Sequence, residues 1–160
     1  MTSNAAAPTR LLFVCLGNIC RSPAAEGVFL HLLEQEGLSD RFLVDSAGTG
    51  SWHVGKPADS RMRAAAERRG IHLPSRARQI SLGDLQAFDR ILTMDDDNLA
   101  AVRSLAGETG ASARIEPITA YCRQRKANEV PDPYYGGSRG FEEVLDLLED
   151  ACAGLLAALR

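Results

Sequence analysis

The sequence has little of what marks a membrane, secreted or nucleic-acid-binding protein. Its 160 residues contain no apolar run near the roughly 20 residues that cross a bilayer. The net charge of −3 disfavours nucleic-acid binding, because a phosphate backbone is bound by a basic face. Residues 1–8 lack the charged and apolar segments of a signal peptide, so a cytoplasmic location is expected. The remaining class is a globular protein, and 45% hydrophobic residues is an ordinary composition for one.

Cofactor signatures are missing as well. The four cysteines are few, and without an export signal they are expected to be thiols rather than disulfides. No grouping of histidines and cysteines supplies four metal ligands, and a bound metal would quench a thiolate. Neither Gly-x-x-x-x-Gly-Lys nor a Gly-x-Gly-x-x-Gly after a strand is present, so no nucleotide site is predicted. We therefore expect no metal and no cofactor.

Apolar runs that read as strands alternate with amphipathic stretches that read as helices. Strands are expected at residues 11–14, 41–46, 90–94 and 113–117. Helices are expected to begin at about residues 23, 59, 82, 95 and 141. The alternation predicts an α/β fold, a doubly wound sheet of about four parallel strands with helices on both faces. Residues 1–9 are expected to be a flexible N-terminal tail and residues 10–160 a single domain.

The motif that organises the chain follows the first strand. Five residues separate Cys15 from Arg21, and Ser22 and Pro23 then open a helix. A loop that ends on a helix N-terminus gathers free backbone N–H groups and so binds anions. The same donors stabilise a thiolate, and the planar guanidinium of Arg21 can hold two oxygens of a phosphoryl group. The loop therefore combines a nucleophile with a phosphate cradle.

Cleavage of a phosphate ester also needs a general acid for the leaving group. The best candidate is Asp132, in Val-Pro-Asp-Pro-Tyr-Tyr, because prolines on both sides restrict the backbone around its carboxyl group. Tyr134 and Tyr135 beside it offer flat apolar walls. Spacing alone leaves Asp45 and Asp95 as alternatives, since both follow predicted strands.

Four stretches in this order resemble the low-molecular-weight protein tyrosine phosphatases: Phe-Val-Cys-Leu-Gly-Asn-Ile-Cys-Arg-Ser-Pro, Asp-Ser-Ala-Gly-Thr, Met-Asp-Asp-Asp-Asn and Val-Pro-Asp-Pro-Tyr-Tyr-Gly. The resemblance covers about residues 10 to 157. It implies a hydrolase of phosphotyrosine in proteins. In this family's mechanism Cys15 would form a cysteinyl-phosphate, and Asp132 would protonate the phenolate and then activate water. Ser22 would ease departure of the thiolate.

The resemblance also implies roles for residues around the nucleophile. Ser46 and His72 are expected to hold the side chain of Asn18, and Cys20 is expected to form a reversible disulfide with Cys15 on oxidation. The phosphate-binding loop would consist of Leu16, Gly17, Asn18, Ile19, Cys20 and Ser22. The aryl pocket would be walled by Leu16, Trp52, Tyr134 and Tyr135. The expected partners are proteins that contain phosphotyrosine, together with phosphate and other oxyanions. The protein itself is expected to be a monomer.

Other interpretations stay open at this stage. An arsenate reductase on the same fold would relay a disulfide through further cysteines, and residues 71–89 contain none. A version resolved by an external thiol would not need them. A phosphocarrier or phosphate-sensing module would use the same cysteine without an acid. Three residues also have simpler explanations, namely Cys20 as a packing residue, Trp52 as a core aromatic and Asp95 as a helix cap.

Overall fold

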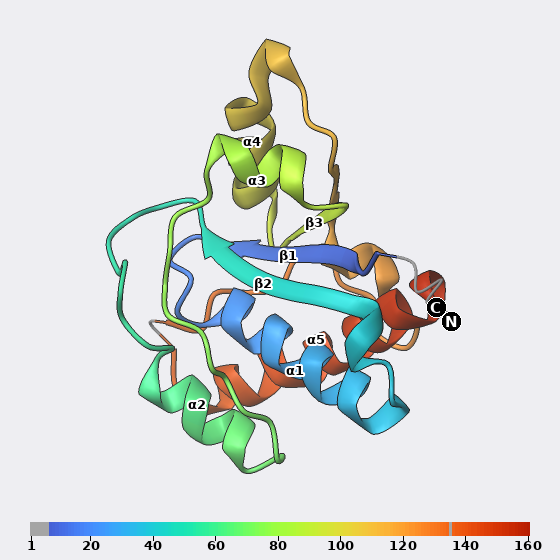
Figure 1. Cartoon of the computed structure of the whole chain (residues 1–160). Helices are drawn as coiled ribbons and strands as arrows, with labels where there is room; N and C mark the ends of the chain where they lie inside the picture. Colours follow the sequence, from blue (N-terminus) through green and yellow to red (C-terminus); the bar gives the residue numbers. More distant parts are fainter. Residues whose placement is uncertain (1–6, 135) are drawn as a thin grey trace.

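The computed structural model describes residues 7–134 and 136–160, and its sheet confirms the predicted α/β architecture. All strand pairs are parallel, in the order β2-β1-β3-β4 (Figure 1). The strands are β1 (Thr9–Cys15), β2 (Phe42–Gly48), β3 (Arg90–Thr93) and β4 (Arg114–Pro117). The predicted tail overlaps β1 at Thr9, and the part of it at residues 1–6 lies outside the described residues.

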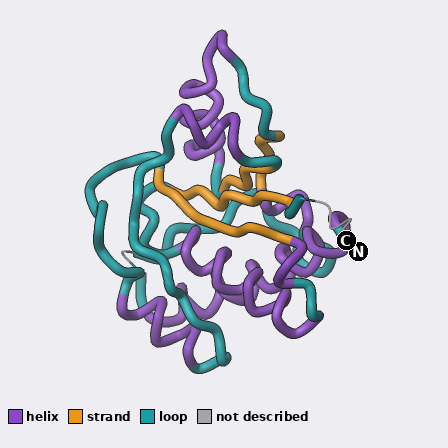
Figure 2. The backbone as a smooth tube through the Cα atoms, in the orientation of Figure 1, coloured by secondary structure: helices purple, strands orange, loops and turns teal. Residues whose placement is uncertain are grey.

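Helices cover both faces of the sheet, which forms the middle layer (Figures 1 and 2). One face packs against α1 (Arg21–Glu36), α2 (Ser60–Glu67) and α5 (Ser138–Leu159). The other packs against α3 (Leu82–Ala87) and α4 (Asp96–Ala106). Three short 3-10 turns complete the described chain: η1 (Ser39–Arg41), η2 (Gly107–Thr109) and η3 (Ile118–Tyr121).

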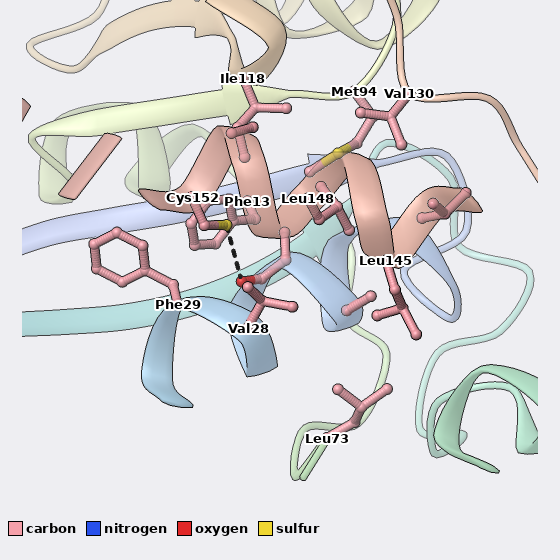
Figure 3. Close-up of a cluster of buried hydrophobic side chains, with 14 of the residues drawn as sticks. Phe13, Val28, Phe29, Leu73, Met94, Ile118, Val130, Leu145, Leu148 and Cys152 are labelled. Atoms are coloured by element: carbon pink, nitrogen blue, oxygen red, sulfur yellow. Dashed lines mark hydrogen bonds between the residues drawn. The ribbon is translucent and has the colours of Figure 1, made fainter. Parts of the chain in front are cut away.

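The larger core lies between the sheet and the pair α1 and α5 (Figure 3). Successive residues of a strand point to opposite faces, so Phe13 enters this core while Leu12 and Val14 enter the smaller one under α3 and α4. Phe13 packs against Phe29 of α1, with ring centroids 6.0 Å apart. Cys152 of α5 is buried here and donates to the carbonyl of Ala25 (3.7 Å), so it is a packing residue.

The helices α1 to α4 begin at or close to the predicted positions, and local signals mark their ends. Gly37 closes α1 with a φ of 68°, and the Asp59 carboxylate caps α2 by accepting from the N–H of Arg61 at 2.8 Å. The last helix differs, because it begins at Ser138 and not near Phe141. Gly140 weakens the helical signal of that first turn, because glycine has a low helix propensity.

Candidate active site

The phosphate-binding loop starts where β1 ends, at the edge where parallel sheets bind ligands. Cys15 is its first residue and is 2% exposed. Asn18 adopts a φ of 57° and is the one non-glycine residue with positive φ in the part of the chain that the structure describes. That turn brings the Asn18 N–H to within 3.3 Å of Cys15 Sγ. A backbone donor therefore faces the predicted nucleophile.

Side chains inside the loop form a buried hydrogen-bond network. The Ser22 hydroxyl lies 3.0 Å from Cys15 Sγ. Asn18 Nδ2 donates to the Ser22 hydroxyl (2.8 Å) and to the Ser46 hydroxyl (3.0 Å). Asn18 Oδ1 accepts from the N–H of Arg78 at 2.9 Å. Asn18 thus connects the loop to β2 and to the segment before α3. The contact with Ser46 was predicted from the sequence.

The prediction that His72 also holds Asn18 is wrong. His72 is exposed and lines a separate groove beside α2. The extended segment after it passes the loop only further along, where the backbones of Gly48 and Gln79 form a bridge. The Arg78 N–H therefore reaches Asn18, and Ser75 reaches Ser46 (3.4 Å).

Glu26 of α1 is a buried carboxyl group that the sequence analysis missed. It is 4% exposed, and the Ser46 hydroxyl donates to its Oε1 at 2.6 Å. Burial raises the pKa of Glu26, and hydrogen bonds from Ser46 and Ser75 offset this only in part. The available signal was its position four residues after Ser22, on the same helical face.

The Arg21 side chain gathers carboxylates from two other segments. It is 2% exposed, and Nη1 donates to Asp95 Oδ2 (2.6 Å) and to the carbonyl of Val130 (3.0 Å). Nη2 lies 3.5 Å from Asp132 Oδ2. Burial opposes the charge on Arg21, but Cys15, Asp95 and Asp132 outweigh it, so the pKa of Arg21 is raised. The structure therefore brings together Arg21 and Asp132, as the sequence predicted.

Asp95 has two partners. Its Oδ1 accepts from the N–H of Asn98 (2.8 Å) and caps α4, while Oδ2 binds Arg21. The cap was predicted, but the ion pair was not. Asp45, the other alternative acid, pairs instead with Arg78 at 3.0 Å. Asp132 is the exposed member of the set, and its Oδ1 accepts from the N–H of Tyr134 at 3.1 Å.

The end of β2 lies against the phosphate-binding loop with no space for a side chain. A Cβ on Gly48 would lie 2.8 Å from the Leu16 carbonyl oxygen and 3.1 Å from the Asn18 nitrogen. The Gly48 N–H also donates to the carbonyl of Arg78 at 2.8 Å. Glycine is therefore required here by close approach of two backbones.

A cleft of about 410 Å³ opens over the loop. Trp52 stands at its rim, 69% exposed, which excludes the core role considered for it. His53 also lines the cleft, with its ring 6.0 Å from that of Tyr134, and was not predicted. Tyr135 lies outside the described residues. The lining residues are Cys15, Leu16, Gly17, Ile19, Cys20, Arg21, Trp52, His53, Asp132 and Tyr134.

The second cysteine of the loop, Cys20, is buried and has no disulfide, and the other three cysteines are also free. Burial, and next the charge of Asp59, raise the pKa of the Cys20 thiol. Within residues 7–134 and 136–160 no three His, Cys, Asp or Glu side chains form a metal-binding group. Over the same residues no helix is long and apolar enough to span a bilayer.

Residues 10–160 match the sequence model of a protein family, described as low molecular weight phosphotyrosine protein phosphatase. The chain belongs to this family. A Bacillus subtilis low molecular weight protein-tyrosine-phosphatase is 43% identical to this phosphatase-family chain, over 94% of it and 95% of the relative.

Solved structures show the same similarity. The protein tyrosine phosphatase of Entamoeba histolytica, with Hepes in its active site, matches this low molecular weight phosphatase with a TM-score of 0.90. The two are 45% identical, and the match covers 94% of this chain and 96% of the other. The Drosophila arginine phosphatase matches with a TM-score of 0.88 at 31% identity, over 94% and 97% of the two chains. Phosphatases named for two different substrates thus share this fold.

Proposed function

We propose that this chain hydrolyses phosphotyrosine in proteins through a cysteinyl-phosphate intermediate. The observation that carries the proposal is that Cys15, Arg21 and Asp132 line one cleft at the end of β1. A nucleophile, a guanidinium fork and a carboxyl group are the three parts that cleavage of a phosphate monoester requires.

In the first step the Cys15 sulfur attacks phosphorus, and the bond from phosphorus to the tyrosine oxygen breaks. Asp132 gives its proton to that oxygen, because a phenolate is a poor leaving group. Arg21 and the backbone N–H groups of the loop bind the other phosphoryl oxygens as charge develops on them. Asp95 keeps the guanidinium of Arg21 in place through its 2.6 Å contact.

In the second step water attacks phosphorus, and the Asp132 carboxylate takes a proton from it. The bond from phosphorus to sulfur breaks, and the electron pair returns to Cys15. The Ser22 hydroxyl, 3.0 Å from Sγ, donates to the departing thiolate. Because Asn18 Nδ2 donates to the Ser22 oxygen, the Ser22 proton points to another acceptor, either sulfur at 3.0 Å or the Ala47 carbonyl at 3.4 Å. Inorganic phosphate leaves, and Asp132 is protonated again.

The walls of the cleft favour an aryl substrate. Leu16, Trp52 and Tyr134 present apolar surfaces around its opening. A flat phenyl ring can stack between such groups, while the phosphoryl group reaches Arg21. Phosphoarginine is a second candidate substrate, because the arginine phosphatase of Drosophila shares the fold.

Two variants test the assignment. Cys15→Ser should abolish hydrolysis and still bind vanadate or phosphate, because the backbone donors and Arg21 remain. Asp132→Ala should lower kcat/KM for phosphotyrosine peptide by about 10²–10⁴-fold. Asp40→Ala, which alters an exposed aspartate in η1, is the control and should match the wild-type protein. Appreciable turnover by Cys15→Ser, or no loss in Asp132→Ala, would remove these residues from their roles.

The same preparations separate the alternative functions. Phosphoarginine peptide and arsenate with an external thiol are supplied to the wild-type protein in parallel with phosphotyrosine peptide. A kcat/KM higher for phosphoarginine would change the substrate, and brisk arsenate reduction with negligible hydrolysis would change the reaction. A stable phosphocysteine in the wild-type protein would indicate a phosphocarrier.

Redox control through Cys15 and Cys20 is part of the proposal. Burial raises the pKa of Cys20, so its thiol stays protonated and reacts poorly with oxidants, and we assign the first oxidation to Cys15, the proposed nucleophile. Peroxide should then give a disulfide between the two that dithiothreitol reverses, as mass spectrometry of the peptides can detect. The cytoplasmic location and the monomeric state remain predictions, and sedimentation equilibrium tests the second.

A further inference from the structure

A chain of polar contacts through Asp59 and Arg61, which do not line the cleft, joins the phosphate-binding loop to the acid segment, residues 131–134. It starts at the Ile19 carbonyl, which accepts from the N–H of Asp59 at 2.8 Å. The Asp59 carboxylate then accepts from Arg61 Nε (3.1 Å) and Nη2 (2.9 Å). This hydrogen bond from Arg61 lowers the pKa of Asp59, so the pair stays charged.

From Arg61 the chain continues to the acid. Arg61 Nη2 donates to the carbonyl of Tyr134 at 3.0 Å, and the N–H of Tyr134 donates to Asp132 Oδ1 at 3.1 Å. The guanidinium carbon lies 5.5 Å from the centroid of the Tyr134 ring and 4.8 Å from that of Phe141 in α5. One side chain thus contacts the backbone and the ring of the acid segment and the first turns of α5.

The acid segment needs such a support. Residues 131–133 form neither helix nor strand, and Asp132 is exposed. Its Oδ2 faces Arg21 at 3.5 Å, but Arg21 is the group that must bind the phosphoryl oxygens. When phosphate takes over that guanidinium, the hydrogen bond from the Tyr134 N–H still orients Asp132.

We propose that Arg61, itself fixed by Asp59, is a positioning residue that sets the Asp132 carboxyl group against the leaving-group oxygen. The inference rests on the proposed function, because it concerns the proton that Asp132 gives. Arg61 is not among the residues that line the cleft. The simpler explanation is an exposed ion pair that caps α2, which would contribute little to stability and nothing to catalysis.

Arg61→Met separates the two explanations, because Met keeps the aliphatic packing and removes the guanidinium. We compare kcat/KM for two aryl phosphates, one with a good leaving group such as p-nitrophenol and one with a poor leaving group such as phenol. If Arg61 positions the acid, kcat/KM should fall about tenfold for the substrate with the poor leaving group and by less for the substrate with the good one. The inhibition constant of inorganic phosphate should not change, because the cradle is untouched.

Arg68→Met is the matched control. Arg68 is the C-cap residue of α2 and pairs with Glu142 at 2.7 Å, and it has no hydrogen bond or ion pair to residues 131–134. It should leave both kcat/KM values at the wild-type level. Asp59→Asn is a second variant for the case that Arg61→Met unfolds. It keeps an oxygen to cap α2 but loses the charge that fixes Arg61, so the same leaving-group pattern should appear with a smaller size.

A double-mutant cycle with Asp132→Ala gives the decisive readout. If Arg61 acts through Asp132, Arg61→Met should cause no further loss in the Asp132→Ala background. An equal loss in both backgrounds, or equal losses for both leaving groups, would overturn the inference. Failure of the proposed function looks different, because Asp132→Ala would then have no effect by itself.

Discussion

Replacing Asn18 by alanine and by glycine should separate two contributions to the order of the phosphate-binding loop. Both variants lose the hydrogen bonds to Ser22, Ser46 and the Arg78 N–H, at 2.8, 3.0 and 2.9 Å. At about 1 kcal/mol for each bond, the loss is about 3 kcal/mol. Against a typical stability of about 5–15 kcal/mol, this is large but leaves a folded protein.

The two variants differ in backbone strain at φ 57°. Alanine pays about 1–2 kcal/mol to stay in the left-handed region, which gives a total loss of about 4–5 kcal/mol. Glycine adopts the conformation freely but has a more disordered unfolded chain, which adds about 0.5–1 kcal/mol to the bond loss. Asn18→Gly should therefore be more stable than Asn18→Ala by about 1 kcal/mol.

Urea denaturation measures both losses, and inhibition by inorganic phosphate measures the cradle. The phosphate inhibition constant should rise about tenfold or more in both variants, because the N–H groups of the loop lose their fixed direction. If Asn18→Gly binds phosphate like the wild-type protein and is equally stable, the side-chain bonds do not hold the loop. If alanine is more stable than glycine, the strain argument is wrong.

Two further changes test other parts of the site. Arg21→Lys should lower kcat/KM for aryl phosphates by about 10²–10³-fold, because the three donors of one ammonium group cannot bind Asp95, the Val130 carbonyl and two phosphoryl oxygens together; a loss below tenfold would contradict this. Glu26→Gln should alter the pH dependence of stability. The raised pKa of Glu26 means that wild-type stability falls as pH rises above the ordinary value of 4.5. Glutamine removes this fall, so the unfolding free energies of variant and wild type should diverge in the variant's favour as the pH rises above 4.5; parallel curves would contradict it.

The parts that the sequence predicted correctly depend on neighbours along the chain. The strand that leads into Cys15, the start of a helix near Asp59 and the helix cap at Asp95 follow from local preferences of a few adjacent residues. The alternation of strands and helices then restricts the topology, because parallel neighbours need crossover connections. The position of the cleft at the end of β1 follows from that topology.

The parts that were missed depend on long side chains that reach across the fold. Arg21 meets Asp95 and Arg61 meets the Tyr134 carbonyl over separations of 74 and 73 residues. No periodicity encodes such a meeting, since it is set by how the helices pack. The prediction that His72 holds Asn18 failed for the same reason, because the distance between the two residues depends on the path of an extended segment.

The glycine that ends β2 has a consequence for how the chain tolerates variation. A methyl group at Gly48 would press on the backbone of the residues that follow Cys15. Every amino acid except glycine would push the strand and the loop apart, whatever its polarity or charge. A library of single substitutions selected for turnover should therefore be depleted at position 48 as strongly as at position 15. Intolerance in such a map reports crowding around the loop as well as chemistry, and only kinetic or binding measurements separate the two.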